Sequence, residues 1–178
     1  MPPRDDRSDE ALVAAINDGD DTAFAALYER HKQWVVNLAF RFTGDAHEAL
    51  DVLQETFAYV LRKTPTLRLT ARMTTFLYPV VRHLALEMRR KRGPVADESL
   101  LADCAIHDPA GQEFTQLIRR LPSGQQEVLL MRFVDDMSLE EIGQALAIPT
   151  GTVKSRLHHA ITTLRADPAT RNYFGKSE

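Results

Sequence analysis

The sequence predicts an all-α protein made of two small helical domains joined by a flexible acidic linker, the C-terminal domain containing a helix-turn-helix. Apolar residues recur at three- and four-residue spacing along most of the 178 residues, and no segment shows the sustained alternation of a strand. Helix caps, glycines and prolines separate these stretches. The stretch 93–112 is acidic and aperiodic, which indicates a linker. We therefore place the domains at 9–92 and 113–167.

The first two helices of the N-terminal domain are defined by their caps. Ser8 can cap a helix that ends near Gly19, because a serine hydroxyl accepts a hydrogen bond from a free backbone N–H of the first turn. Asp20 or Asp21 can cap a longer second helix, and Gly44 can end it. The apolar positions of the second helix repeat at helical spacing: Phe24, Leu27, Tyr28, Trp34, Val35, Leu38 and Phe42.

The third and fourth helices flank a polar, basic loop, T-P-T-L-R-L-T-A-R, at residues 64–72. Asp45 can cap the third helix, and a fourth helical stretch at 73–92 is stopped by Gly93 and Pro94. Pro79 lies inside this stretch, where it lacks an N–H and clashes with the preceding turn. We expect the fourth helix either to start near Pro79 or to be kinked there.

The C-terminal domain is expected to contain helices near 112–120, 123–134, 139–146 and 150–166. Ser138 and Glu141 form a capping box before the third of these, and Pro149 is tolerated at the start of the fourth. Two short helices around a tight turn, with a cationic second helix, are typical of a helix-turn-helix that reads the DNA major groove. An ordinary amphipathic hairpin is the alternative. The apolar face of the last helix consists of Val153, Leu157, Ile161 and Leu164.

Charge is distributed unevenly around a net value of −3. Residues 62–92 carry nine Lys/Arg against one acidic residue, whereas residues 1–61 carry five against twelve. A basic block beside acidic ones is typical of a phosphate-facing surface set against a surface for another partner. A solvated helical face is the alternative explanation.

Other function classes find little support in the composition. No apolar run approaches the length of a membrane span, and the N-terminus lacks a signal-peptide core, so we expect a cytoplasmic protein without membrane insertion. Cys104 is the only cysteine, which excludes an intrachain disulfide, and the six histidines lack metal-ligand spacing. With no nucleophile or phosphate-loop constellation either, we expect no metal, no cofactor and no catalytic activity.

Four motifs resemble the small two-domain bacterial sigma factors of the extracytoplasmic-function group. L-P-S-G-Q-Q-E-V-L-L-M-R-F, S-L-E-E-I-G-Q-A-L and G-T-V-K-S-R-L resemble the fourth sigma domain, which reads the −35 promoter element. A-L-D-V-L-Q-E-T-F, at 49–57, resembles the part of the second sigma domain that docks on RNA polymerase. The resemblance spans 12–164 and implies initiation of transcription with core RNA polymerase on promoter DNA, under the control of an anti-sigma factor.

The resemblance also implies three sets of functional residues. Contacts to the −35 element would come from Thr152, Lys154, Ser155, Arg156, His158 and His159, with Arg156 either on a phosphate or in a structural pair. Recognition and melting of the −10 element would use Arg68, Arg72, Phe76, Arg82, His83, Arg89, Arg90, Lys91 and Arg92. Core polymerase would dock on Asp51, Gln54 and Glu55.

Several positions depart from the pattern of the family. The family often has Trp at Phe76, Asn at His83 and Asp at Glu87, so the −10 readout is expected to differ. Arg is common at His159, and because histidine lacks the bidentate fork of arginine, we expect an altered or weaker −35 preference. Gly143 stands where the family usually has Ala, at a helical cost of about 1 kcal/mol.

Two rival functions fit parts of this sequence. A sigma mimic that sequesters an anti-sigma factor would have a degraded DNA-reading surface, which His159 and Pro79 slightly favour and the intact G-T-V-K-S-R-L disfavours. A plain helix-turn-helix regulator would leave A-L-D-V-L-Q-E-T-F unexplained. An enzyme is the weakest alternative.

Overall fold

The computed structural model describes residues 5–93 and 117–167, and the chain divides into two compact units, Met1–Pro94 and Val95–Glu178. Every regular element within these described residues is a helix, which confirms the predicted all-α class. The predicted linker, apart from Gly93, lies outside the described residues, as does most of the helix expected near 112–120.

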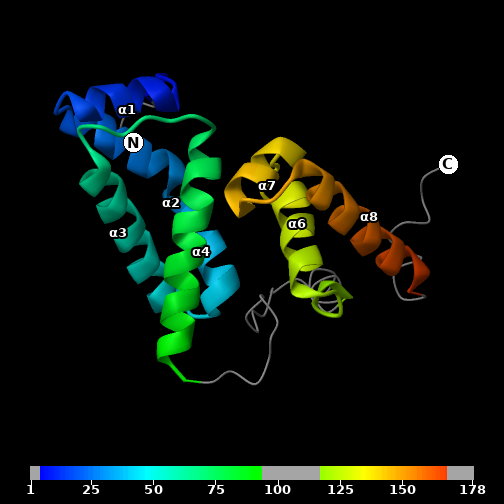
Figure 1. Cartoon of the computed structure of the whole chain (residues 1–178). Helices are drawn as coiled ribbons and strands as arrows, with labels where there is room; N and C mark the ends of the chain where they lie inside the picture. The colour runs from blue at the N-terminus through cyan, green and yellow to red at the C-terminus, as the bar shows by residue number, and fades with distance from the viewer. Residues whose placement is uncertain (1–4, 94–116, 168–178) are drawn as a thin grey trace. The chain divides into compact units, whose positions relative to one another are not determined.

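The first unit is a bundle of three long helices with a short helix across one end (Figure 1). Helix α1 packs on α2, and α2, α3 and α4 pack on one another. The helices are α1 (Asp9–Asn17), α2 (Asp21–Thr43), α3 (Ala46–Lys63) and α4 (Met73–Lys91).

Three of these helices start at the side-chain caps expected from the sequence. Ser8 accepts a hydrogen bond from the N–H of Ala11, and Asp45 accepts two from the first turn of α3. Asp20, rather than Asp21, caps α2. Gly44 ends α2 with φ of 69°, a left-handed conformation that glycine adopts without steric cost. These helix boundaries therefore follow from local chemistry.

The structure rules out one of the two alternatives expected for Pro79, that α4 starts there. The helix begins at Met73, so it runs through Pro79 instead of starting there. Pro79 lies on the exposed side of α4, while Leu77 and Tyr78 are buried against the bundle. Burial of this apolar face outweighs the loss of one backbone hydrogen bond, because each large buried side chain contributes about 1.5–3 kcal/mol.

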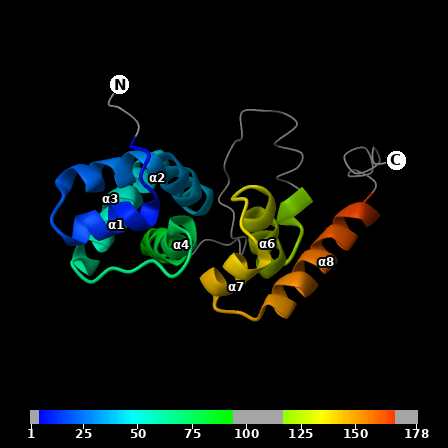
Figure 2. The same cartoon turned by 90° about the horizontal axis from the view of Figure 1, so that it is seen from above.

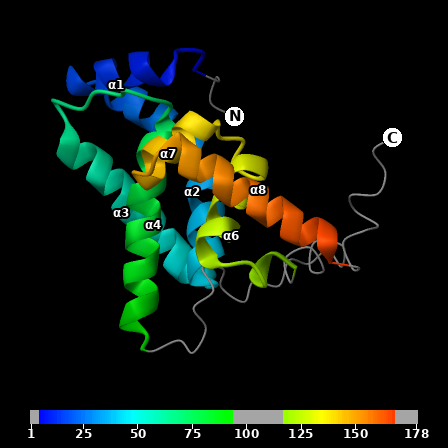
Figure 3. The same ribbon diagram turned by 45° about the vertical axis from the view of Figure 1, so that its right-hand side comes forward.

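The second unit packs α6 (Ser123–Phe133) and α7 (Leu139–Leu146) against the long α8 (Thr150–Ala166), as Figure 3 shows. These bounds confirm the helices predicted at 123–134, 139–146 and 150–166. Residues 117–119 are helical, and Leu117, Ile118 and Leu121 are buried. The predicted helix-turn-helix is therefore α7 followed by α8.

Candidate nucleic-acid interface

Helix α7 begins at a side-chain cap and ends in a close turn that leads into α8. Ser138 Oγ accepts from the N–H of Glu141, and the Glu141 carboxylate accepts from the N–H of Ser138, so the predicted capping box is present. Ala147 ends α7 with φ of 53°, in the left-handed region. A Cβ atom on Gly143 would lie 2.9 Å from the carbonyl oxygen of Ile148. The missing side chain therefore lets the turn fold back closely on α7.

Helix α8 separates its core face from the residues predicted to read DNA. Its buried positions are Val153, Leu157, Ala160 and Leu164. Lys154, Ser155, His158 and His159 are exposed, and the His158 and His159 rings meet edge to face with centroids 5.9 Å apart. Thr152 is half-buried. A helix with this division can bury one side in the protein and present the other to a groove.

Arg156 differs from the other predicted residues of α8 because it packs against α6. It is half-buried, and its guanidinium lies so close to Gly124 that a Cβ there would be 3.1 Å from Nη1. The absent side chain of Gly124 leaves the space that the planar guanidinium occupies. Of the two roles expected for Arg156, this packing favours the structural one.

The basic loop at 64–72 has one buried residue and exposes its arginines. Leu67 is buried, whereas Arg68 and Arg72 on its C-terminal side are exposed. The Leu67 carbonyl accepts a hydrogen bond of 2.8 Å from Asn17 Nδ2 at the end of α1. Sequence reasoning missed Asn17, since a contact across fifty positions leaves no local pattern.

The cations at the end of α4 do not form one uniform surface. Arg92 pairs with the Glu48 carboxylate at the start of α3 and donates to the Thr43 carbonyl at 2.9 Å. Hydrogen bonding to Glu48 raises the pKa of Arg92 above its usual value. Lys91 Nζ lies 3.5 Å from the Glu87 carboxylate. Arg90 is exposed.

The other predicted members of the −10 set occupy intermediate or exposed positions. Arg82 and Arg89 are half-buried, and the exposed His83 ring lies 3.9 Å from Glu87. Phe76 is half-buried against Tyr59, with ring centroids 6.3 Å apart.

Tyr78, two positions after Phe76 on α4, is a core residue. It is 1 % exposed, and its ring contacts Phe42 edge to face at 6.5 Å. Because a base cannot reach a side chain this deeply buried, stacking on Tyr78 is excluded in this fold.

Helix α3 presents a mixed acidic and apolar face. Asp51, Gln54 and Glu55 are all exposed, as their spacing predicts. Leu50 and Leu61 are 48 % and 46 % exposed on the same helix. Two exposed leucines interrupt the amphipathic pattern of α3. Their positions on the polar side of the helix could have been found from the sequence alone.

No cluster of three or more His, Cys, Asp or Glu residues suited to a metal ion occurs in 5–93 or 117–167. Over the same described residues, none of the helices is both long and apolar enough to span a membrane.

Comparisons with known proteins assign each unit separately. The family model for Sigma-70 region 2 matches residues 27–94, and that for Sigma-70 region 4 matches residues 111–164. The chain is 30% identical to the ECF RNA polymerase sigma factor SigE of Mycolicibacterium smegmatis, covering 89% of this chain and 68% of the relative. It is also 30% identical to the RNA polymerase sigma-H factor of Pseudomonas aeruginosa, covering 85% of this chain and 89% of that protein.

Solved structures share the fold at lower sequence identity. CnrH in complex with the cytosolic domain of CnrY matches with a TM-score of 0.68 and 18% identity, covering 96% of this chain and all of that one. The sigma factor RpoE of Bartonella quintana, in complex with the anti-sigma factor NepR, matches with a TM-score of 0.58 and 18% identity, over 75% of this chain and 89% of that one.

Proposed function

We propose a division of labour between the two units of this chain, which belongs to the extracytoplasmic-function sigma factors of the sigma-70 family. As such a factor, the chain binds core RNA polymerase, directs it to specific promoters and initiates transcription there. Different surfaces perform these steps, and the exposed candidate side chains mark each surface.

The second unit reads the −35 element through the exposed face of α8. Lys154, Ser155, His158 and His159 face away from the buried side of the helix and are placed to reach base edges. Arg156 acts from behind this face, holding α8 against Gly124. Each good base contact contributes about 1–3 kcal/mol of discrimination.

The first unit opens and holds the −10 element with the basic loop at 64–72 and the exposed part of α4. Melting exposes unpaired bases, and capturing them on the protein offsets the cost of unpairing. Arg68, Arg72 and Arg90 are exposed cations that suit this role. Arg92 is assigned instead to holding α4 on α3.

Core polymerase docks on α3, where Asp51, Gln54 and Glu55 form an exposed polar face. Leu50 and Leu61 extend this face with apolar surface, a combination typical of protein interfaces with a buried centre and a polar rim. The polymerase performs the phosphoryl transfer, and this chain contributes no catalytic group. It acts in the cytoplasm, where core polymerase and promoter DNA are present.

An anti-sigma factor is the proposed regulator. Both structural relatives described above are complexes, with the cytosolic domain of CnrY and with NepR. A partner of this kind would silence the chain by covering the α3 and α8 faces assigned here to polymerase and DNA.

Run-off transcription tests the division of labour. Purified core polymerase is incubated with upstream fragments from the source genome, with and without the protein, and recovered promoters are then tested with Lys154→Ala. We expect relaxed preference at one −35 base pair, because a base contact acts locally. Thr163→Ala, an exposed position in the last turn of α8, is the matched control. Unchanged −35 preference in Lys154→Ala would refute the placement of α8, and core binding without transcripts would favour a sigma mimic.

A further inference from the structure

The basic loop is tied to a helix that precedes the region matched by the family model. Asn17 Nδ2, at the end of α1, donates to the Leu67 carbonyl at 2.8 Å, and Leu67 is 6 % exposed. The residues on either side, Thr66 and Arg68, are exposed. Figure 2 shows the loop between α3 and α4 passing alongside α1. One hydrogen bond and one apolar anchor therefore fix the middle of the loop and leave its neighbours facing outward.

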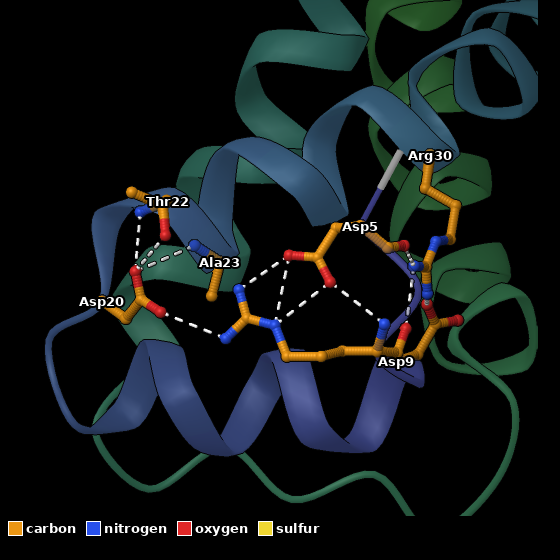
Figure 4. Close-up of polar contacts among 7 residues, drawn as sticks. Asp5, Asp9, Asp20, Thr22, Ala23 and Arg30 are labelled. Atoms are coloured by element: carbon orange, nitrogen blue, oxygen red, sulfur yellow. Dashed lines mark hydrogen bonds and ion pairs between the residues drawn. The ribbon is translucent and has the colours of Figure 1, made fainter. Parts of the chain in front are cut away.

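Helix α1 is itself fastened to α2 at its N-terminal end (Figure 4). Asp9 accepts from Arg30 Nη1 at 2.7 Å and lies 3.0 Å from Nε2 of His31, a buried side chain. Arg30 Nη2 also donates to the backbone carbonyls of Asp5 and Arg7, at 2.7 and 2.8 Å. These contacts join the start of α1 to the middle of α2.

A second contact joins the N-terminal segment to the first turn of α2. Arg7 pairs with Asp5 at 2.7 Å and with Asp20, the N-cap of α2, at 3.1 Å. Asp20 also accepts from the Thr22 hydroxyl and from the N–H of Ala23. With both contacts in place, α1 cannot slide along α2 without breaking several charged hydrogen bonds.

The hydrogen bond from Asn17 fixes the place of the Leu67 carbonyl but adds little to the free energy of unfolding. Its Nδ2 is engaged by Leu67, but its Oδ1 is buried without a hydrogen-bond partner. An unpaired buried acceptor costs free energy, which offsets much of the gain from the bond to Leu67. What the contact retains is a fixed location for the Leu67 carbonyl.

We propose that α1 is a strut that positions the basic loop, and that Asn17 is a positioning residue for capture of the −10 element. The inference rests on the proposed function, in which this loop holds unpaired −10 bases. A loop ordered before DNA arrives loses less conformational entropy on binding, so a positioned loop binds more tightly. Helix α1 lies outside the residues 27–94 that match Sigma-70 region 2.

The test compares Asn17→Ala and Asn17→Asp with Ser8→Ala. Asn17→Asp keeps the shape of the side chain but loses the donor, while Ser8→Ala removes the cap of α1 far from the loop. Holoenzyme containing each variant is assayed on a promoter from the run-off experiment for permanganate reactivity of −10 thymines, core binding and −35 preference. The unfolding temperature of each variant is measured as well.

We expect both Asn17 variants to reduce −10 opening about threefold to tenfold, the range associated with one hydrogen bond, with core binding and −35 preference unchanged. Ser8→Ala, at a similar unfolding temperature, should open the −10 element normally. The proposal that α1 positions the loop is wrong if Asn17→Ala opens the −10 element as well as the wild type does. It is also wrong if Asn17→Ala and Ser8→Ala reduce −10 opening equally.

Arg68→Ala separates the strut from the function on which it rests. If Arg68→Ala reduces −10 opening and the Asn17 variants do not, only the strut is wrong. If Arg68→Ala also opens the −10 element normally, the loop does not capture DNA and both proposals fail.

Discussion

Arg92 is the residue whose position in the fold differs most from the role expected from the sequence. Sequence resemblance places it on a DNA phosphate, but in the structure it pairs with Glu48 and donates to the Thr43 carbonyl. Arg92→Ala would remove both contacts between the end of α4 and the α2–α3 turn. The two side chains are 47 % and 22 % exposed, so solvent screens the pair. We expect Arg92→Ala to destabilise the first unit by about 1 kcal/mol.

Thermal unfolding followed by circular dichroism measures this loss. For a unit of this size, a loss of about 1 kcal/mol lowers the unfolding temperature by about 4–8 °C. The salt dependence of holoenzyme binding measures the competing role, because each phosphate contact contributes about 0.9 to the slope of log K against log salt concentration. We expect Arg92→Ala to leave this slope unchanged.

Arg90→Ala is the matched control on the same helix. Arg90 is exposed, so its loss should reduce the salt slope by about 0.9 and leave the unfolding temperature near that of the wild type. A reduced salt slope with unchanged stability in Arg92→Ala would contradict the structural role of Arg92. Arg92 would then leave Glu48 and bind a phosphate when DNA is present.

Three further predictions concern caps, packing and pH. Ser138→Ala should cost the second unit about 1 kcal/mol in urea unfolding, since it removes the α7 cap; unaltered stability would contradict the capping box. Gly143→Val should cost about 1–3 kcal/mol in the same assay, because its Cβ would meet the Ile148 carbonyl at 2.9 Å; a variant as stable as the wild type would show that the turn yields freely. Hydrogen bonds from the Thr22 hydroxyl and Arg7 lower the pKa of Asp20 from 3.8 to about 2, so its stabilising contribution is complete above pH 4 and is lost as the pH falls towards 2. Denaturation of Asp20→Asn from pH 5 to 2 should therefore show a weaker loss than the wild type, and parallel curves would exclude this source of acid sensitivity.

Much of the fold could be predicted because its signals are local. Helix starts follow from caps such as Ser8, Asp45 and Ser138, whose side chains bond to N–H groups two or three positions away. The exposed face of α8 follows from helical periodicity, so Lys154 and His159 are exposed as expected. Pro79 marks the limit of such reasoning, because burial of the surrounding face overrides a local preference.

The sequence by itself determined the helical class, most of the helix boundaries and the polar faces, since each depends on residues within one or two turns of one another. Only the tertiary structure decided which cations are available to DNA and what holds the basic loop. The pairs Arg92–Glu48 and Asn17–Leu67 join residues 44 and 50 positions apart. Whether such residues meet depends on how the helices pack, and this packing is set by many buried contacts together rather than by any local pattern.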